Sequence, residues 1–157
     1  MNARLDLFTN PVATKFIKHI NAASQVSRTT EVPIDTLELM ALRISQINVC
    51  AVCVDMHTKD ATERGETAVR LNLVATWREA TVYTEAERAA LALAEEGTRL
   101  ADAAPGVSDE VWAEAAKHYT EEQLAALIAT IGIMNTWNRL NIITQQPAGD
   151  YKPGQWG

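Results

Sequence analysis

Residues 84–101, TEAERAALALAEEGTRLA, identify the fold class most directly. The first four, TEAE, form a capping box, in which the Thr and Glu side chains bond each other's backbone N–H groups at the start of a helix. Ala, Leu and Glu dominate the residues that follow, and all three are strong helix formers. Residues 120–144, TEEQLAALIATIGIMNTWNRLNIIT, open with a second capping box, TEEQ. We therefore predict helices over both stretches, the second being the longest in the chain.

Helical signals recur along the rest of the chain. Pro11 suits the first turn of a helix over residues 11–24. Val12, Phe16 and Ile20 recur there every four positions and predict one apolar helix face. Another helix is expected around the two cysteines, and further helices are expected over about residues 33–46, 66–77 and 108–117.

The composition is that of one ordinary globular domain. The chain has 157 residues, of which 47% are apolar and 22% charged, so it can bury a core and is not disordered. No segment alternates apolar and polar residues between hairpin turns, as strands would. We predict an all-α fold, a single-domain helical bundle of about six helices over residues 1–157, ending in an irregular Pro/Gly-rich tail at about residues 146–157.

Charge and hydropathy bear on partners and location. The net charge is -6 and the pI is about 5.0, which argues against binding to nucleic acid or to anionic membranes. The N-terminal residues lack the apolar run of a signal peptide. The longest uncharged apolar run, Leu124–Met134, is too short to cross a bilayer. We therefore expect a cytoplasmic protein with no nucleic-acid or membrane partner.

The long helix over residues 120–144 carries more apolar surface than one core face needs. Leu127, Ile128, Ile131 and Trp137 lie on more than one side of it. Such a helix is either a central core helix, apolar all round, or a helix whose outer side packs on another subunit. The two interpretations are compatible.

The chemistry centres on Cys50, Cys53, His57 and Glu38. If the segment from Cys50 to His57 is one helix, the two cysteines and the histidine occupy positions i, i+3 and i+7 and share a face. Glu38 lies twelve residues before Cys50 and reaches this face only if the chain turns tightly near Asn48. The pattern leaves open whether that turn breaks the helix or only kinks it.

These residue types together suit thiol chemistry. A thiol with its ordinary pKa of about 8.5 is mostly protonated at neutral pH. An imidazole in contact with the thiol can accept its proton, and a carboxylate behind the imidazole fixes the tautomer. The thiolate can attack a peroxide and become a sulfenic acid, which a second thiol within reach converts to a disulfide and water. Cys53 and His57, four positions apart, are placed for contact on a helix.

Other interpretations of the cysteine pair stay open. A zinc site would need Cys50, Cys53, His57 and Glu38 as its four ligands, because the chain lacks a second C-x-x-C or H-x-x-x-H pair. A thioredoxin-like motif needs a βαβ context that the helical pattern does not provide. The two cysteines can also be buried structural residues beside an unrelated histidine.

The motif resembles the signature of a known family. E-x11-C-x-x-C-x3-H, from Glu38 to His57, is similar to that of the AhpD-like alkylhydroperoxidases within the carboxymuconolactone decarboxylase superfamily. The similarity continues in order and spacing through SQINVCAVCVDMHTKDA, ATWREATVYTEAERAALALAE and YTEEQLAALIATIGIMNTWNRLN, which resemble the peroxidase-related branch. It covers roughly residues 30–145.

The resemblance implies an all-α homo-oligomer, trimeric or hexameric, that reduces organic hydroperoxides without haem, flavin or metal. It implies that Cys53 attacks the peroxide, that Cys50 resolves the sulfenic acid, and that His57 and Glu38 relay the proton. The implied reductant is a dithiol, such as a dihydrolipoyl group on a partner protein. Helix spacing places Cys53 nearest His57, but Cys50 shares the face and can gain from a helix N-terminus, so the reverse assignment stays open.

Two alternatives to peroxidase turnover use the same residues. Ala51 and Val52 stand where some family members carry a His or an aromatic residue, which leaves the rate and the choice of reductant open. The cysteine pair can instead be the switch of a redox-sensing or scaffold oligomer. Decarboxylase members of the superfamily lack the pair, which argues against that activity here.

Several polar residues near these motifs are expected to have simple structural roles. Asn135, Asn138 and Asn141 of the long helix would satisfy backbone or interface groups, with substrate contact as the alternative. Asp55 and residues 58–60 are expected to face solvent.

Overall fold

The structure, a computed structural model, describes residues 2–102 and 106–156. Within these ranges the chain forms α-helices, two short 3-10 turns and no strand, which confirms the predicted all-α class. The helices are α1 (Pro11–Val26), α2 (Ile34–Ile47), α3 (Ala51–Glu63), α4 (Ala68–Leu73), α5 (Glu85–Thr98), α6 (Asp109–His118) and α7 (Glu121–Thr144). The turns are η1 (Ser27–Thr29) after α1 and η2 (Val74–Thr76) after α4.

The described residues contain seven helices rather than about six, because the chain breaks fully between α2 and α3. α2 ends at Ile47 with Asn48 as its C-cap, and Val49 has a φ of 59°, a left-handed conformation that a right-handed helix cannot continue through. The Cys50 N–H then donates to the Ser45 carbonyl at 2.9 Å. This break allows α3 to pack against α2.

The two predicted capping boxes are both present. The Thr84 hydroxyl accepts from the Glu87 N–H, and the Glu87 carboxylate accepts from the Thr84 N–H. Thr120 and Gln123 make the same reciprocal pair at the start of α7. A helix cap of this kind typically contributes about 1 kcal/mol. The caps therefore fix where α5 and α7 begin.

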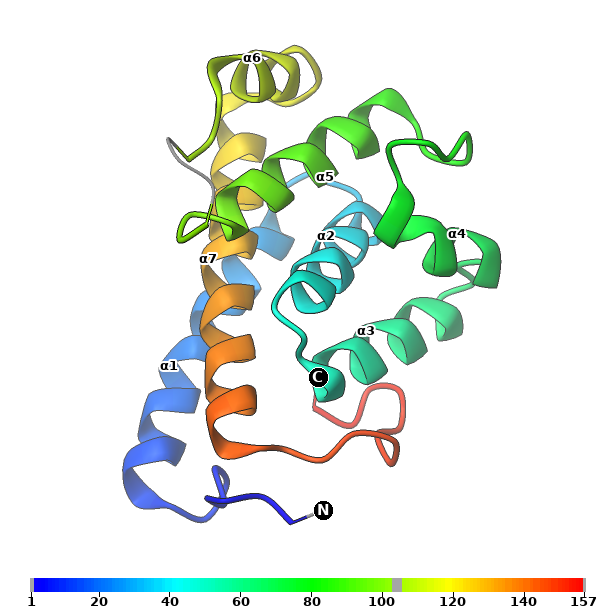
Figure 1. Ribbon diagram of the computed structural model, residues 1–157. Coiled ribbons are helices and arrows are strands. Elements are labelled where there is room, and N and C mark those ends of the chain that lie inside the picture. The colour runs from blue at the N-terminus through cyan, green and yellow to red at the C-terminus, as the bar shows by residue number, and fades with distance from the viewer. Residues whose placement is uncertain (1, 103–105, 157) are drawn as a thin grey trace.

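α2 is the central helix of the bundle. It packs against α5, α3 and α7, and Figure 1 shows these helices arranged around it. α1 runs alongside α7 at the outer edge (Figure 1). After α7 the chain returns towards α3 as a tail, red in Figure 1, which forms no helix or strand over residues 146–156.

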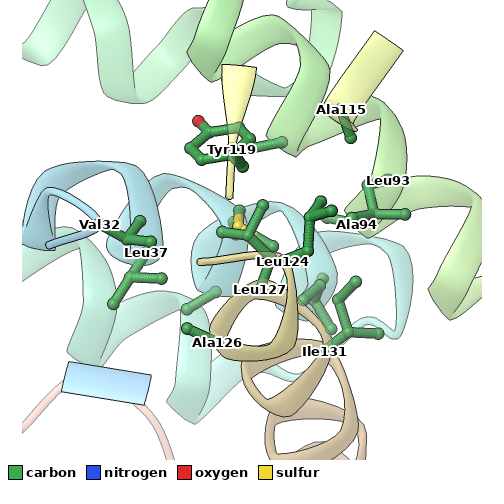
Figure 2. Packing of buried hydrophobic residues seen from close by; sticks show 14 of the residues in the cluster. Val32, Leu37, Leu93, Ala94, Ala115, Tyr119, Leu124, Ala126, Leu127 and Ile131 are labelled. Atoms are coloured by element: carbon green, nitrogen blue, oxygen red, sulfur yellow. The ribbon is translucent and has the colours of Figure 1, made fainter. Parts of the chain in front are cut away.

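Two buried apolar clusters hold α2 on different sides. One joins α2 to α5, α6 and α7, and Figure 2 shows Leu37, Leu93 and Leu127 packed within it. The other joins Leu42 of α2 to the segment that ends at Trp77. Each fully buried Leu or Ile side chain contributes roughly 1.5–3 kcal/mol. α2, which carries Glu38, is thereby a rigid support for the site described below.

The buried face of α1 differs from the prediction. Ile17 and Ile20 are buried, whereas Val12 is 78% exposed and Phe16 is 50% exposed. The reason is that α1 packs against α7, which covers the side carrying Ile17 and Ile20. The prediction therefore holds for Ile20 but not for Val12 and Phe16, because periodicity alone does not show which side of the helix another helix covers.

α7 is a core helix that also has a partly exposed apolar side. Leu127 is fully buried, and Ile131 and Met134 are buried in the core. Ile128 and Ile143 are 49% and 66% exposed, so the outer side of the helix is also apolar. In the part of the chain that the structure describes, no helix, α7 included, is long and apolar enough to cross a membrane.

Candidate active site

The two cysteines lie at the start of α3. Cys50 is the N-cap residue and α3 begins at Ala51, so the segment from Cys50 to His57 is helical except for its first residue. The Asn48 side chain donates to Asn138 of α7 at 2.9 Å. This bond ties the turn before Cys50 to the core.

Cys50 and Cys53 form a disulfide, and their Cα atoms lie 5.3 Å apart. Both residues are buried, at 1% and 2% exposure. The predicted spacing of three residues therefore brings the sulfurs together, and the structure describes the oxidised form of the pair.

Glu38 of α2 and His57 of α3 form a second buried pair. His57 Nδ1 donates to Glu38 Oε2 at 2.8 Å. Because an ionised carboxylate only accepts hydrogen bonds, Nδ1 carries a proton, and Nε2 is the nitrogen left to act as a base. His57 Nε2 is buried and has no hydrogen-bond partner among residues 2–102 and 106–156. The predicted reach of Glu38 across the turn at Asn48 is thus observed.

Two arginines hold the other oxygen of Glu38. Arg28 of η1 donates to Oε1 at 2.9 Å, and Arg64 at the end of α3 lies 3.4 Å from the same oxygen. Burial alone would raise the pKa of Glu38, but the hydrogen bond and charge of His57, with the charges of Arg64 and Arg28, lower it to about 2. Glu38 is therefore a fixed carboxylate that orients His57 rather than one that takes up its proton.

Cys53, His57 and Glu38 line one cavity of about 660 Å³. Its other walls come from α1, α7 and the tail, and they include the largely apolar side chains Ile17, Met56, Trp137, Tyr151 and Trp156. Cys50 instead lines a separate, more open hollow beside Gln46 and Val49. The two cysteines of the disulfide therefore line different spaces.

All four residues singled out from the sequence meet at this site. His57 and Cys53 line the same cavity, but the histidine bonds Glu38 and makes no hydrogen bond to the sulfur. The Cys53 sulfur is engaged in the disulfide. Over the described ranges, no three His, Cys, Asp or Glu side chains are grouped as a metal site would require.

Comparison with known proteins identifies the family of the chain. Residues 16–96, more than half of its length, match the carboxymuconolactone decarboxylase family. The chain belongs to this family. It is 40% identical over 119 residues to the uncharacterized protein YdfG of Bacillus subtilis (strain 168), which covers 76% of each protein.

Solved structures resemble this member of the carboxymuconolactone decarboxylase family closely. ATU0492 from Agrobacterium tumefaciens, a protein of unknown function and candidate antioxidant defence protein AhpD, has a TM-score of 0.87 and 29% identity, over 96% of this chain and 100% of that one. The debrominase Bmp8, in complex with 2,3,4-tribromopyrrole, has a TM-score of 0.72 and 25% identity, over 90% of this chain and 73% of its own. The chain is thus AhpD-like.

In this AhpD-like protein the C-terminal tail is bound to α3. Asp55 accepts a hydrogen bond from the Gly149 N–H at 2.8 Å, and the Tyr151 hydroxyl donates to Asp60 at 2.9 Å. The prediction that these carboxylates simply face solvent is therefore wrong. Their partners lie more than ninety residues away in the sequence, beyond the reach of any local pattern. The contacts bring Tyr151 and Trp156 to the wall of the cavity.

α7 supplies a polar contact to the disulfide that the sequence did not assign. Asn141 Nδ2 donates to Cys53 Sγ at 3.3 Å, and Asn141 lines the cavity. Asn135 and Asn138 instead bond Asn48, which is a structural role of the kind expected for them. The sequence feature that pointed to a shared role was the spacing of three residues between Asn135, Asn138 and Asn141, which places their side chains near one side of a helix.

Proposed function

We propose that the protein is a thiol peroxidase that reduces organic hydroperoxides to alcohols through a Cys50–Cys53 dithiol–disulfide cycle. One observation carries the proposal: Cys53 lines the same cavity as the His57–Glu38 pair, and the walls of that cavity include apolar side chains. Membership in the carboxymuconolactone decarboxylase family and the likeness to an AhpD candidate support it.

The residues of the site divide the reaction between them. In the reduced protein, His57 Nε2 accepts the Cys53 thiol proton, while Glu38 holds the ring through Nδ1. The thiolate attacks the terminal peroxide oxygen, so that an S–O bond forms and the O–O bond breaks. The alkoxide leaves as an alcohol with the proton from His57, and Cys53 becomes a sulfenic acid. The Cys50 sulfur then displaces hydroxide, which leaves with the Cys50 proton as water, and the disulfide forms.

An external dithiol closes the cycle by supplying two electrons and two protons to the disulfide. We propose a dihydrolipoyl group on a partner protein as a reductant of this class, with no haem, flavin or metal required. The hollow beside Cys50 supports this proposal, because it offers a dithiol a route to the disulfide outside the peroxide cavity.

We infer that the protein works as a homo-oligomer in the cytoplasm. Val12 and Phe16 of α1 and Ile143 of α7 expose apolar side chains, and α1 packs against α7. A second copy covering these side chains would remove them from water. We expect a trimer or hexamer in light scattering, and a monomer at micromolar concentration would contradict this inference. A reducing cytosol would keep the two thiols available.

The activity test is peroxide consumption with cumene hydroperoxide as substrate and dihydrolipoamide as reductant. We expect turnover by the wild-type protein and none by Cys53→Ser. The matched variant Cys50→Ser should react with peroxide once through Cys53 and then stop, since it cannot form the disulfide. Unchanged turnover in Cys53→Ser would refute the proposal.

A second candidate is the reductive debromination of an aromatic ring. The likeness to Bmp8, whose structure holds 2,3,4-tribromopyrrole, favours it, as does Trp137 at the cavity wall. In that reaction the bromoarene would become the arene and hydrogen bromide while the two thiols become the disulfide. Bromide release from tribromopyrrole by the reduced protein, without peroxide consumption, would replace the first proposal with this one.

A further inference from the structure

An amide contacts the sulfur of Cys53. Asn141 Nδ2 donates to Cys53 Sγ at 3.3 Å, across a separation of 88 residues in the sequence. Asn141 is half-buried and lines the cavity that Cys53 and His57 share. In the described part of the chain, no other side chain donates a hydrogen bond to either sulfur of the disulfide.

The thiolate of a peroxidase cycle would need such a donor here. Cys53 is only 2% exposed, and burial disfavours a negative charge that nothing compensates. His57 can take the proton, yet its Nε2 makes no hydrogen bond to the sulfur. An amide N–H donates without giving up a proton, so it can stabilise the thiolate whether His57 is neutral or charged.

We propose that Asn141 is a catalytic residue whose side-chain amide donates a hydrogen bond to the Cys53 thiolate and stabilises it for attack on peroxide. This role rests on the proposed peroxidase function. The Asn141 side chain lies on a firmly packed part of α7, because Met134 and Asn138 of the same helix are buried in the core. The same helix therefore holds the donor in place when the disulfide opens.

Other charged and titratable groups also surround the cavity that holds Cys53. They are His57, Asp60, Glu63 and Arg64 in and after α3, Glu38 of α2, Arg28 of η1 and Tyr151 of the tail. All of them are retained when only position 141 is changed. A comparison of variants at that position therefore isolates the contribution of the amide.

The test measures the thiolate without using peroxide. In reduced Cys50→Ser protein Cys53 is the single thiol, and its alkylation rate by iodoacetamide as a function of pH gives the midpoint of its ionisation. We expect Asn141→Ala in this background to raise the midpoint by about one pH unit. At a pH below the midpoint, the fraction of Cys53 present as thiolate would then fall about tenfold. Asn141→Asp should raise it further, because a carboxylate repels the thiolate. Ile142→Ala, at the next and exposed position of α7, should leave it unchanged.

The outcomes separate this role from the proposed function. Unchanged midpoints in Asn141→Ala and Asn141→Asp would overturn it, whatever the peroxidase activity. A raised midpoint in a protein that consumes no peroxide would support the amide's effect on the thiolate while contradicting the peroxidase proposal. With Cys50 intact, peroxide turnover of Asn141→Ala should fall about tenfold and recover as the pH is raised, which lost packing alone would not produce. If Asn141→Ala does not fold, Asn141→Leu, which has a similar side-chain size, no N–H donor and no charge, decides the question.

Discussion

Glu38 and Glu95 are two buried glutamates that each pair with two arginines, but only Glu38 also bonds a histidine. They are 4% and 5% exposed, and each carboxylate is held by two arginines. Arg43 of α2 donates to one oxygen of Glu95 at 2.6 Å, and Arg78, which follows η2, binds the other. Glu95 thus joins α5 to α2 and to the segment after η2.

The two carboxylates differ in the residue that binds their second oxygen. Glu38 gives one oxygen to its arginines and the other to His57, which lines the cavity with Cys53. Arginines take both oxygens of Glu95. In each case burial would raise the pKa of the carboxyl group, and the basic partners outweigh it and lower the pKa. The buried Glu95 carboxylate therefore links helices to one another, whereas the buried Glu38 carboxylate orients the His57 base.

Removing the histidine should have the largest effect. We expect His57→Ala to lower kcat/KM for an organic hydroperoxide by about a hundredfold at pH 7, because Cys53 loses its general base. His118→Ala, at a surface histidine of α6 that pairs with Glu114, is the matched control and should leave kcat/KM unchanged. Equal losses in the two variants would show that His57 is not the base.

Exchanging each glutamate for its amide tests the comparison itself. Glu38→Gln should lower turnover about tenfold, because an amide holds the His57 N–H less strongly than a carboxylate does. Glu95→Gln should change turnover per folded molecule by less than about twofold but lower the unfolding temperature, because Arg43 is left buried without a counter-charge. Equal losses of turnover in both variants, after correction for folded protein, would remove the distinction between the clusters.

Acid should weaken the Glu38 cluster in a definite pH window. Its folded-state pKa of about 2 lies below the ordinary 4.5, so its contribution is full above pH 4.5 and is lost as the pH falls towards 2. The shift corresponds to roughly 3 kcal/mol. The stability difference between wild type and Glu38→Gln in urea should therefore shrink between pH 5 and pH 3. A difference that stays constant over this range would contradict the shifted pKa.

The smallest effect is expected at Arg28. Its side chain is 46% exposed, and Arg64 also contacts Glu38, so Arg28→Ala should cost at most about 1 kcal/mol of stability. Turnover should fall by no more than about threefold, because His57 remains bonded to Glu38. A tenfold loss of turnover in Arg28→Ala would mean that Arg64 alone cannot hold the Glu38 carboxylate in position.

Local sequence patterns predicted much of the fold and the centre of the site. The capping boxes at Thr84 and Thr120 marked the starts of α5 and α7, because a cap involves residues only three positions apart. The spacing of Cys53 and His57 likewise placed both residues on the side of α3 that lines the cavity, whereas Cys50 is the N-cap residue and lines a separate hollow. In each case the chemistry lies within one or two helical turns.

Contacts between distant segments could not be predicted in this way. Asn141 reaches Cys53 from α7, and Asp60 binds Tyr151 of the tail, because tertiary packing brings those segments together. The apolar stripe of Val12, Phe16 and Ile20 had the right period for a helix, but only Ile20 is buried and the other two are exposed. A period identifies a helix, whereas the neighbours that a face meets depend on the whole fold.

The most direct test of the Cys50–Cys53 peroxidase cycle is the intact mass of the reduced protein after one equivalent of an organic hydroperoxide. We expect the wild type to lose two hydrogens as the Cys50–Cys53 disulfide forms. Cys50→Ser should gain one oxygen, on Cys53, the cysteine that lines the cavity with His57. Thiols that stay reduced, or an oxygen that appears on Cys50 in the Cys53→Ser protein at the same rate, would contradict it.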